Sequence, residues 1–279
     1  MAKLFLVGLG PGSLDHMSIR AQEVIHNADV VVGYGLYVKL IAPLLTNQTL
    51  VRSGMTKEWQ RADCAIKHVQ EGQNVALVCS GDAGMYAMAP LIFELISSQS
   101  LSLEVETVPG ITAANACASL VGAPLGHDSC TISLSDLLTP WDVIVKRIKA
   151  AADADFAITF YNPRSRKRQN HIVEARDILL QHRCKETPVA VVNAAYRDEQ
   201  SVQLSTLEYF TDLEFGMNAA VIVGNSSSYR FEDWIVTPRG YNKKYDLEDG
   251  ATRAGQRPGH ALKASEDSQP SQDKTGEVV

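Results

Sequence analysis

Short apolar runs alternate with helically periodic segments along most of the chain. Residues 4–8, 29–33 and 74–79 are apolar over lengths typical of buried strands. Between them, residues 18–27 and 58–70 place apolar side chains on one helical face. This alternation predicts an α/β protein with largely parallel sheets.

The alternation continues to about residue 224. Further strands are expected at 103–108, 130–134, 155–161, 188–193 and 219–224, a short strand and turn or helix at 204–212, and helices at 85–97, 112–120, 140–152 and 168–183. We predict an N-terminal α/β domain over 1–120 and a C-terminal α/β domain over 121–241. Each is expected to hold a mixed, mainly parallel sheet flanked by helices. Gly122, Pro124 and Gly126 mark the boundary.

The end of the chain has a different composition. From residue 246 onward the large apolar residues are only Leu247, Leu262, Val278 and Val279. Such a segment buries too little apolar surface to offset the entropy lost on ordering. We therefore predict a disordered polar tail over 242–279.

Composition and charge narrow the possible functions. The net charge is −6, which argues against a nucleic-acid partner bound through a broad basic face. No apolar run approaches the roughly 20 residues of a membrane span, and the glycines and proline at 10–12 interrupt the first run too early for a signal peptide. The five cysteines are scattered without CxxC, and HExxH is absent. We expect a cytoplasmic protein with reduced thiols and no dedicated metal site.

Three glycine-containing loops follow predicted strands, at 8–13, 80–86 and 108–114. The first lacks the dinucleotide fingerprint, because Ser13 stands where GxGxxG needs glycine and Pro11 removes a backbone N–H group. No Gly-Lys dipeptide exists, which excludes a P-loop. Ligands of open α/β sheets bind at the carboxyl ends of strands. The loops therefore predict a small-molecule site there.

A basic cluster follows the strand predicted at 155–161. It consists of Arg164, Arg166, Lys167 and Arg168. Cations at a helix N-terminus oppose the helix dipole, so a bound anion would explain the cluster. Further basic residues at predicted loop edges are Arg52, Lys57, Arg61, Arg197 and Arg239. Local basic loops in an acidic protein fit a small polyanionic substrate.

Acid–base groups occur near the predicted domain junction. His127 precedes Asp128, and Ser135 precedes Asp136. For each residue a structural role is weighted equally with acid–base chemistry: helix capping for Asp136, and a structural hydrogen bond for His127. A Ser–His–Asp hydrolase is disfavoured, because no GxSxG motif is present.

The loops and motifs together resemble the S-adenosylmethionine-dependent tetrapyrrole methyltransferases of corrin biosynthesis. The elements shared with the whole family are residues 8–12, 80–82 and 109–113. Elements typical of its ring-contracting C17-methylating branch are 33–37, 54–62, 126–128, 132–141, 161–163, 222–226 and 237–241. The resemblance runs from about residue 3 to residue 241 and does not cover the tail.

The resemblance implies a two-domain tetrapyrrole methylase fold, an active site in the trough between the domains, and a homodimer. It implies S-adenosylmethionine as cofactor and precorrin-3B, or alternatively cobalt-precorrin-3, as tetrapyrrole substrate. The matching cofactor positions are Gly10, Pro11, Ser80, Gly81, Asp82, Met85, Thr112, Ala113, Asn162 and Ala194. The acid–base candidates are His127, Asp128 and Asp136; the substrate-binding candidates are Tyr34, Glu58, Arg61, Ser133, Ser135, Arg164 and Arg166.

Three other classes compete with this interpretation. A nicotinamide-dependent oxidoreductase is disfavoured by Ser13 and by the lack of an acidic residue after the second strand. An RNA methyltransferase of related fold would use the basic cluster, but the net charge disfavours it mildly. A non-catalytic binding module is the third. Titration with S-adenosylmethionine, NAD and RNA separates them.

Overall fold

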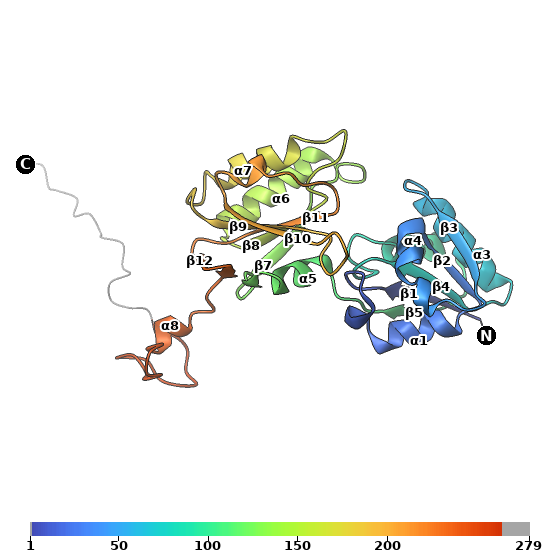
Figure 1. Ribbon diagram of the computed structural model, residues 1–279, viewed down its shortest axis with the longest axis horizontal. Helices are drawn as coiled ribbons and strands as arrows, with labels where there is room; N and C mark the ends of the chain where they lie inside the picture. The colour runs from blue at the N-terminus through green and yellow to red at the C-terminus, as the bar shows by residue number, and fades with distance from the viewer. Residues whose placement is uncertain (1, 264–279) are drawn as a thin grey trace, which may run out of the picture. The chain divides into compact units, whose positions relative to one another are not determined.

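The computed structural model describes residues 2–263 (Figure 1). The chain divides into two compact units, Met1–Thr237 and Pro238–Val279. In the second unit, the short helix α8 (Tyr241–Lys244) precedes turns in which aspartate side chains accept backbone N–H groups, such as Asp246 Oδ1 from Glu248 N at 2.9 Å. Residues 242–263 thus hold local hydrogen bonds in place of a core, and the expected disorder of 242–279 stays a prediction. Residues 264–279 lie outside the described part.

A five-stranded, all-parallel sheet occupies the first part of the larger unit. Its strands, in spatial order, are β3 (Thr49–Ser53), β2 (Val30–Tyr34), β4 (Val75–Cys79), β1 (Lys3–Gly8) and β5 (Glu104–Val108). The sequence pattern predicts all of these except β3. Most side chains of this edge strand are exposed, so its sequence shows no continuous apolar run of the kind that predicts a buried strand.

Helices cover both faces of this sheet. One face packs against α1 (Ile19–Asn27) and α2 (Gly35–Leu40), the other against α3 (Glu58–Gln70) and α4 (Ala89–Ser98). As predicted, Ser18 caps α1, its Oγ accepting from Ala21 N at 3.2 Å. Helix α4 begins four residues later than predicted, because Pro90 has no N–H group to donate to the carbonyl of residue 86.

A second five-stranded sheet is mixed. Its strands, in spatial order, are β10 (Ser201–Thr206), β9 (Pro188–Asn193), β11 (Ala219–Val223), β8 (Ala157–Tyr161) and β7 (Ser129–Ser133). Only β7 and β8 pair in parallel, so mainly parallel pairing holds for the first sheet and not for the second. Helices α6 (Trp141–Asp153) and α7 (His171–Leu179) pack on one face. A small sheet of β12 (Tyr229–Phe231), β13 (Trp234–Val236) and β6 (Gly122–Ala123) is not predicted.

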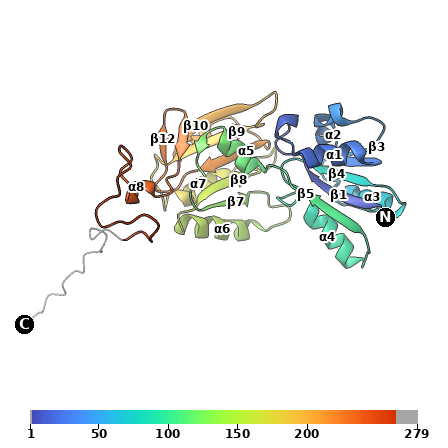
Figure 2. The same cartoon turned by 90° about the horizontal axis from the view of Figure 1, so that it is seen from below.

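The opposite face of the second sheet is covered by α5 (Ala113–Ser119), as Figures 1 and 2 show. Its small side chains at 116–118 pack against Ala190, Val192, Ala220 and Ile222. The passage from one sheet to the other therefore falls between β5 and α5, and not near residue 120 as predicted. The glycine and proline residues at 122–126 mark β6 and its following turn instead.

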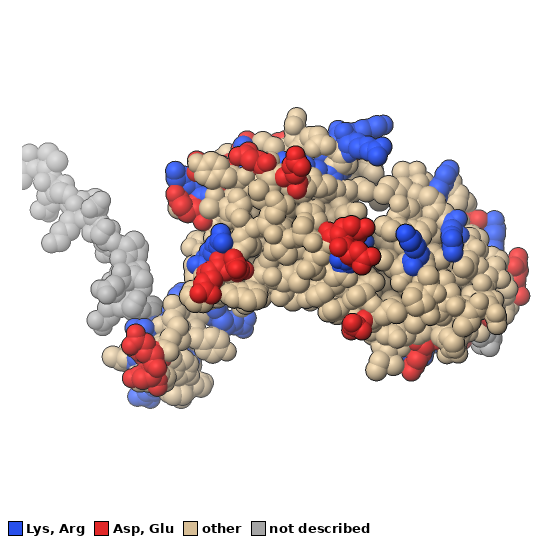
Figure 3. Space-filling model, in the orientation of Figure 1, with Lys and Arg blue, Asp and Glu red and all other residues tan. Residues whose placement is uncertain are grey.

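Charged side chains of both signs are interspersed on the face drawn in Figure 3. Near the N-terminus, Glu106 accepts from Arg20 Nε at 2.9 Å and lies 2.9 Å from Lys3 Nζ. Hydrogen bonds from these two cations lower the pKa of Glu106 to about 2. The carboxylate is therefore ionised at neutral pH.

Glu106→Gln is expected to lower stability only where the native carboxylate is charged. Because the folded-state pKa is depressed, the stabilisation is present above pH 4.5 and is lost as the pH falls through about 2. The pair is exposed, so the difference should not exceed about 1 kcal/mol. Urea unfolding at pH 7 and pH 2.5 measures it; an equal difference at both values would contradict the assignment.

Candidate functional site

The three glycine loops meet at the carboxyl edge of the first sheet. Gly10 N donates to Gly81 O at 3.0 Å, and Gly81 N donates to Gly10 O at 2.7 Å. A Cβ atom on Gly110 would overlap the Gly81 carbonyl oxygen and lie 2.6 Å from the carbonyl carbon of Gly8. Glycine is thus required because three backbones touch. The loops form one platform of exposed backbone.

Asp82 holds this platform together. Its Oδ1 accepts from Gly84 N at 2.8 Å, and its Oδ2 accepts from Gly110 N at 3.1 Å. Both carboxylate oxygens are therefore engaged in joining the second loop to the third. The structure gives Asp82 a role in shaping the predicted cofactor site.

A second set of loops lies at one edge of the mixed sheet. Strands β7, β8 and β9 run in the same direction, so their carboxyl ends share that edge. Ser133, Asn162 and Ala194 lie at or just after those ends. Asn162 has a φ of 51° and Ala194 a φ of 44°, left-handed conformations that are rare for residues other than glycine and cluster at functional sites. The two predicted second-domain cofactor positions thus share an edge and an unusual backbone.

Tyr161 joins this edge to the glycine platform. Its hydroxyl lies 2.5 Å from Thr112 Oγ1 and accepts from Ala114 N at 2.8 Å. Burial raises the pKa of Tyr161, so the phenol stays neutral and can donate to Thr112. Tyr161 therefore fixes the first turn of α5, where the predicted cofactor positions Thr112 and Ala113 lie.

Arg197 makes a second connection between the two sets of loops. Its Nε donates to Pro11 O at 2.6 Å, and its Nη2 donates to Ser80 Oγ at 2.7 Å. Gly12 leaves room for this side chain, since a Cβ atom there would lie 2.7 Å from Arg197 Nε. The sequence indicates Arg197 only as a basic loop residue. Its bridging role could not be seen there, because its two partners, the Pro11 carbonyl and the Ser80 hydroxyl, lie more than 100 positions away in the sequence.

Met85 and Tyr86 make further contacts with β7. Tyr86 Oη donates to Thr131 O at 3.1 Å, and Thr131 Oγ1 lies 3.8 Å from Met85 Sδ. Met85 is thus at the same junction as Tyr161, and its cofactor role stays a prediction. Sequence reasoning does not single out Tyr86, because an exposed tyrosine in a turn carries no motif.

A hollow of about 380 Å³ opens beside the platform. It is lined by Asp15, His16, Met17, Ser18, Pro109, Gly110 and Ile111. The His16 ring packs against Tyr196 with 3.9 Å between ring centroids and a tilt of 32°, and Ser13 Oγ lies 2.6 Å from His16 Nδ1. The hollow lies beside the loops after β1 and β5.

The structure separates the predicted acid–base residues. His127 and Asp128 precede β7, whereas Asp136 follows it. The length of β7 places Asp128 roughly 16 Å from Ser133 at a strand rise of about 3.3 Å per residue. His127 Nδ1 accepts from Asp128 N at 2.7 Å and lies 3.1 Å from Asp128 Oδ2. These two residues therefore do not form one acid–base cluster with Asp136.

Asp136 belongs to a cluster of its own. Its carboxylate lies 3.4 Å from Arg168 Nη1 and 3.8 Å from His171 Nε2. The His171 ring stacks on Trp141, with centroids 3.8 Å apart. The helix-cap alternative for Asp136 is wrong, because Pro140 is the N-cap residue of α6. Asp136 is instead held by Arg168 and His171, and Arg168 also donates to Asn162 O.

The predicted basic lining is only partly accessible. Helix α7 begins at His171, so the cations at 164–168 lie in a turn and not at a helix N-terminus as predicted. Arg164 donates to Thr211 O at 2.5 Å and Leu213 O at 3.0 Å and lies over the Phe215 ring, so its role is structural. Arg166 is exposed and can meet a substrate.

The remaining predicted substrate residues differ in accessibility. Ser133 Oγ accepts from Asn162 Nδ2 at 3.1 Å and from Ser135 N at 3.2 Å, which places both serines beside the cofactor position. Arg61 is buried and donates to Ser53 Oγ and Gly54 O, so it supports the loop before α3 rather than presenting a cation. Glu58 is exposed in the first turn of α3, and Tyr34 packs edge-on against Tyr37.

Within residues 2–263, no group of three or more His, Cys, Asp or Glu side chains is placed to hold a metal ion. No helix in this described part is long and apolar enough to cross a membrane.

The family model of the tetrapyrrole (corrin/porphyrin) methylases matches residues 3–210, and the chain belongs to this family. This confirms the family indicated by the sequence motifs.

Two relatives and one solved structure illustrate the similarity. The chain is 50% identical over 249 residues to a cobalt-factor III methyltransferase of Priestia megaterium, covering 88% of this chain but 46% of that longer protein. It is 48% identical to a probable cobalt-factor III C(17)-methyltransferase of Salmonella typhimurium, over 85% of this chain and 99% of that one. The crystal structure of the methyltransferase CobJ superimposes with a TM-score of 0.80 at 35% identity, over 85% of this chain and 100% of that chain.

Tyr161→Phe is expected to weaken cofactor binding by about tenfold, because Thr112 and Ala114 N each lose a hydrogen-bond partner worth roughly 0.5–1.5 kcal/mol. Calorimetric titration with S-adenosylhomocysteine measures the affinity. The matched control is Tyr229→Phe, which makes the same change at an exposed tyrosine on β12 and should bind like the wild type. Equal affinities of the two variants would contradict the role assigned to Tyr161.

Proposed function

We propose that the chain transfers a methyl group from S-adenosylmethionine to C17 of a tetrapyrrole at the cobalt-factor III level, with ring contraction, in cobalamin biosynthesis. The observation that carries this proposal is the 48% identity to the Salmonella protein across 99% of its length. The relatives at 50% and 48% identity are both named for cobalt-factor III, so the cobalt-bearing substrate is favoured over precorrin-3B.

The residues present fit S-adenosylmethionine. The platform of three touching glycine backbones offers peptide groups without side chains in the way, and it carries none of the phosphate motifs that a nucleotide needs. Gly10, Gly81, Thr112 and Ala113 would hold the cofactor from one side. Asn162 and Ala194 would hold it from the other, and Met85 would contact it at the junction.

The bound cofactor supplies an electrophilic methyl group, so the chain's main task is alignment of the reacting atoms. Tyr161 and Arg197 fix the two loop sets against each other and thereby set that alignment. Ring contraction also requires proton transfer. Asp136 is the best-placed proton-transfer group, since it follows the end of β7 and is linked to Asn162 through Arg168, whereas His127 and Asp128 lie beyond the other end of β7.

Incubation of the purified protein with S-adenosylmethionine and either cobalt-factor III or precorrin-3B tests the proposal. We expect formation of S-adenosylhomocysteine, a mass gain of one methyl group and a change in the absorption spectrum with the cobalt-bearing substrate. Faster turnover of precorrin-3B would reverse the substrate assignment. Absence of methylation of both substrates would overturn the function.

We further propose that the protein is a cytoplasmic homodimer. The exposed aromatic side chains of the β12–β13 hairpin, Tyr229, Phe231 and Trp234, support a contact surface between subunits. Light scattering of the wild type and of Trp234→Ser measures the mass; a monomeric wild type would exclude the dimer.

A further inference from the structure

Two adjacent leucines project from the loop between β7 and α6, residues 134–140. Leu137 is 79% exposed and Leu138 98% exposed, the two highest values among the large apolar side chains of residues 2–263. Single exposed apolar side chains are common and need no explanation. A neighbouring pair next to Asp136, at the edge that carries Asn162, is a candidate contact surface.

The loop that carries these leucines is held at both ends. At its start, Leu134 is buried, its N–H donates to Tyr161 O at 2.9 Å, and its carbonyl accepts from His171 Nδ1 at 3.2 Å. At its end, Pro140 begins α6 and Trp141 stacks on His171. The leucines are therefore presented by an anchored loop, which reduces the ordering entropy that binding would cost.

A basic turn lies beside the apolar tip. Ser165 and Arg168 exchange backbone hydrogen bonds of 2.9 and 3.1 Å, which closes a turn that exposes Arg166 and Lys167. Arg168 links this turn to the leucine loop through Asp136 and to Asn162 through its carbonyl oxygen, at 2.9 Å. One edge of the sheet thus presents an apolar tip and two cations within a connected framework.

We propose that Leu137 and Leu138 contact an apolar face of the tetrapyrrole macrocycle while Arg166 and Lys167 pair with its carboxylates. This inference rests on the proposed function and extends it to the substrate-binding surface. A flat macrocycle with carboxylates on its rim has the two chemistries that this edge presents. Continuity with Ser133, Asn162 and Asp136 favours the substrate over a second copy of the chain as the occupant.

The double variant Leu137→Asn/Leu138→Asn tests the apolar contact. We expect the KM for the tetrapyrrole to rise by about tenfold or more, because two leucine side chains lose burial against the macrocycle. The affinity for S-adenosylhomocysteine should be unchanged. The matched control is Leu247→Asn/Leu262→Asn, which makes the same change at leucines that are 70% and 48% exposed and belong to the second compact unit. This control should keep the wild-type KM.

Titration of the protein with the tetrapyrrole in the absence of a methyl donor, monitored by the absorption spectrum, separates this inference from the proposed function. A wild type that binds but does not methylate would overturn the function and leave the binding surface testable. Unchanged tetrapyrrole affinity in the leucine double variant would overturn the inference. The inference would also be overturned if the double variant converted a dimer to monomers while its substrate affinity stayed unchanged. The leucines would then belong to a subunit contact.

Discussion

Gly110→Ala is expected to abolish cofactor binding and to destabilise the first sheet. The added Cβ would overlap Gly81 O and lie 2.6–2.7 Å from the Gly8 carbonyl group. All of these atoms belong to backbone, so no side-chain rotation can relieve the overlap, and β1, β4 and β5 would have to move apart. We expect a loss of about 3 kcal/mol in unfolding free energy, at the upper end for overpacking. Thermal melting with and without S-adenosylhomocysteine measures both effects.

Gly216→Ala provides the control for this prediction. A Cβ atom on Gly216 meets nothing within 4 Å, and its φ is outside the left-handed region. The change should therefore leave stability unaltered or raise it by about 0.4–1 kcal/mol through the unfolded chain. Gly8→Ala places a Cβ atom 2.6 Å from Gly110 N and should reproduce the loss from the other side of the contact. Wild-type melting and cofactor-induced stabilisation of Gly110→Ala would refute the close-packed platform.

The buried parts of the fold could be predicted from sequence, whereas its edges could not. Runs such as those of β1 and β4 are apolar because both faces of the strand are covered. Edge strand β3 and the small sheet that contains β6 escape this signal, since their side chains are mostly exposed. Helix α5 was predictable as a helix, but its small residues do not reveal that it packs on the second sheet.

The candidate site shows a similar division. Glycine loops mark one side of it, because the need for touching backbones restricts those positions to glycine. The contacts of Arg164 and Arg197 could not be read from sequence, since their carbonyl partners lie on distant segments and backbone acceptors leave no trace in residue type. The sequence also placed both His127 and Asp136 near the domain junction, whereas the strand between them puts the two at opposite ends.

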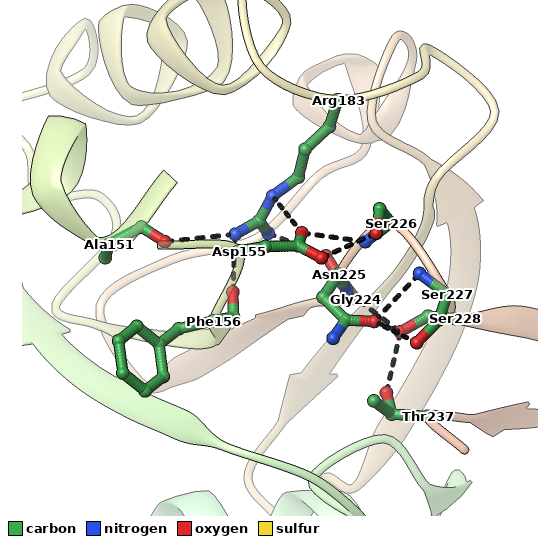
Figure 4. Close-up of polar contacts among 10 residues, drawn as sticks. All are labelled: Ala151, Asp155, Phe156, Arg183, Gly224, Asn225, Ser226, Ser227, Ser228 and Thr237. Carbon is green, nitrogen blue, oxygen red and sulfur yellow. Dashed lines mark hydrogen bonds and ion pairs between the residues drawn. The ribbon is translucent and has the colours of Figure 1, made fainter. Parts of the chain in front are cut away.

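Arg183 anchors a polar network at the end of the second sheet opposite to the candidate site (Figure 4). Its side chain is fully buried and donates to Gly224 O at 2.6 Å and to Phe156 O, while Nε lies 3.9 Å from Asp155 Oδ1. Asp155 in turn accepts from Ser226 N at 2.9 Å and from Ser226 Oγ at 2.5 Å. Burial lowers the pKa of Arg183, but the guanidinium stays charged and is compensated by these oxygens.

The loop after β11 extends the network to the small sheet. Asn225 Oδ1 accepts from Ser227 N and Ser228 Oγ, each at 3.1 Å, and Ser228 Oγ lies 2.7 Å from Thr237 Oγ1. Thr237 donates to Pro124 O at 2.6 Å. Arg183 thus fixes one end of a chain of contacts that holds the segment after β13.

Arg183→Met is expected to lower the unfolding free energy by about 3–5 kcal/mol, because two buried carbonyl groups and Asp155 lose their donor. Urea unfolding measures the loss. Arg147→Met, the same change at an exposed position of α6, should stay within about 0.5 kcal/mol of the wild type. Because the network lies at the other end of β8 from Tyr161 and Asn162, the folded Arg183→Met protein should bind S-adenosylhomocysteine with wild-type affinity. Weakened binding with unchanged stability would show instead that Arg183 acts on the site.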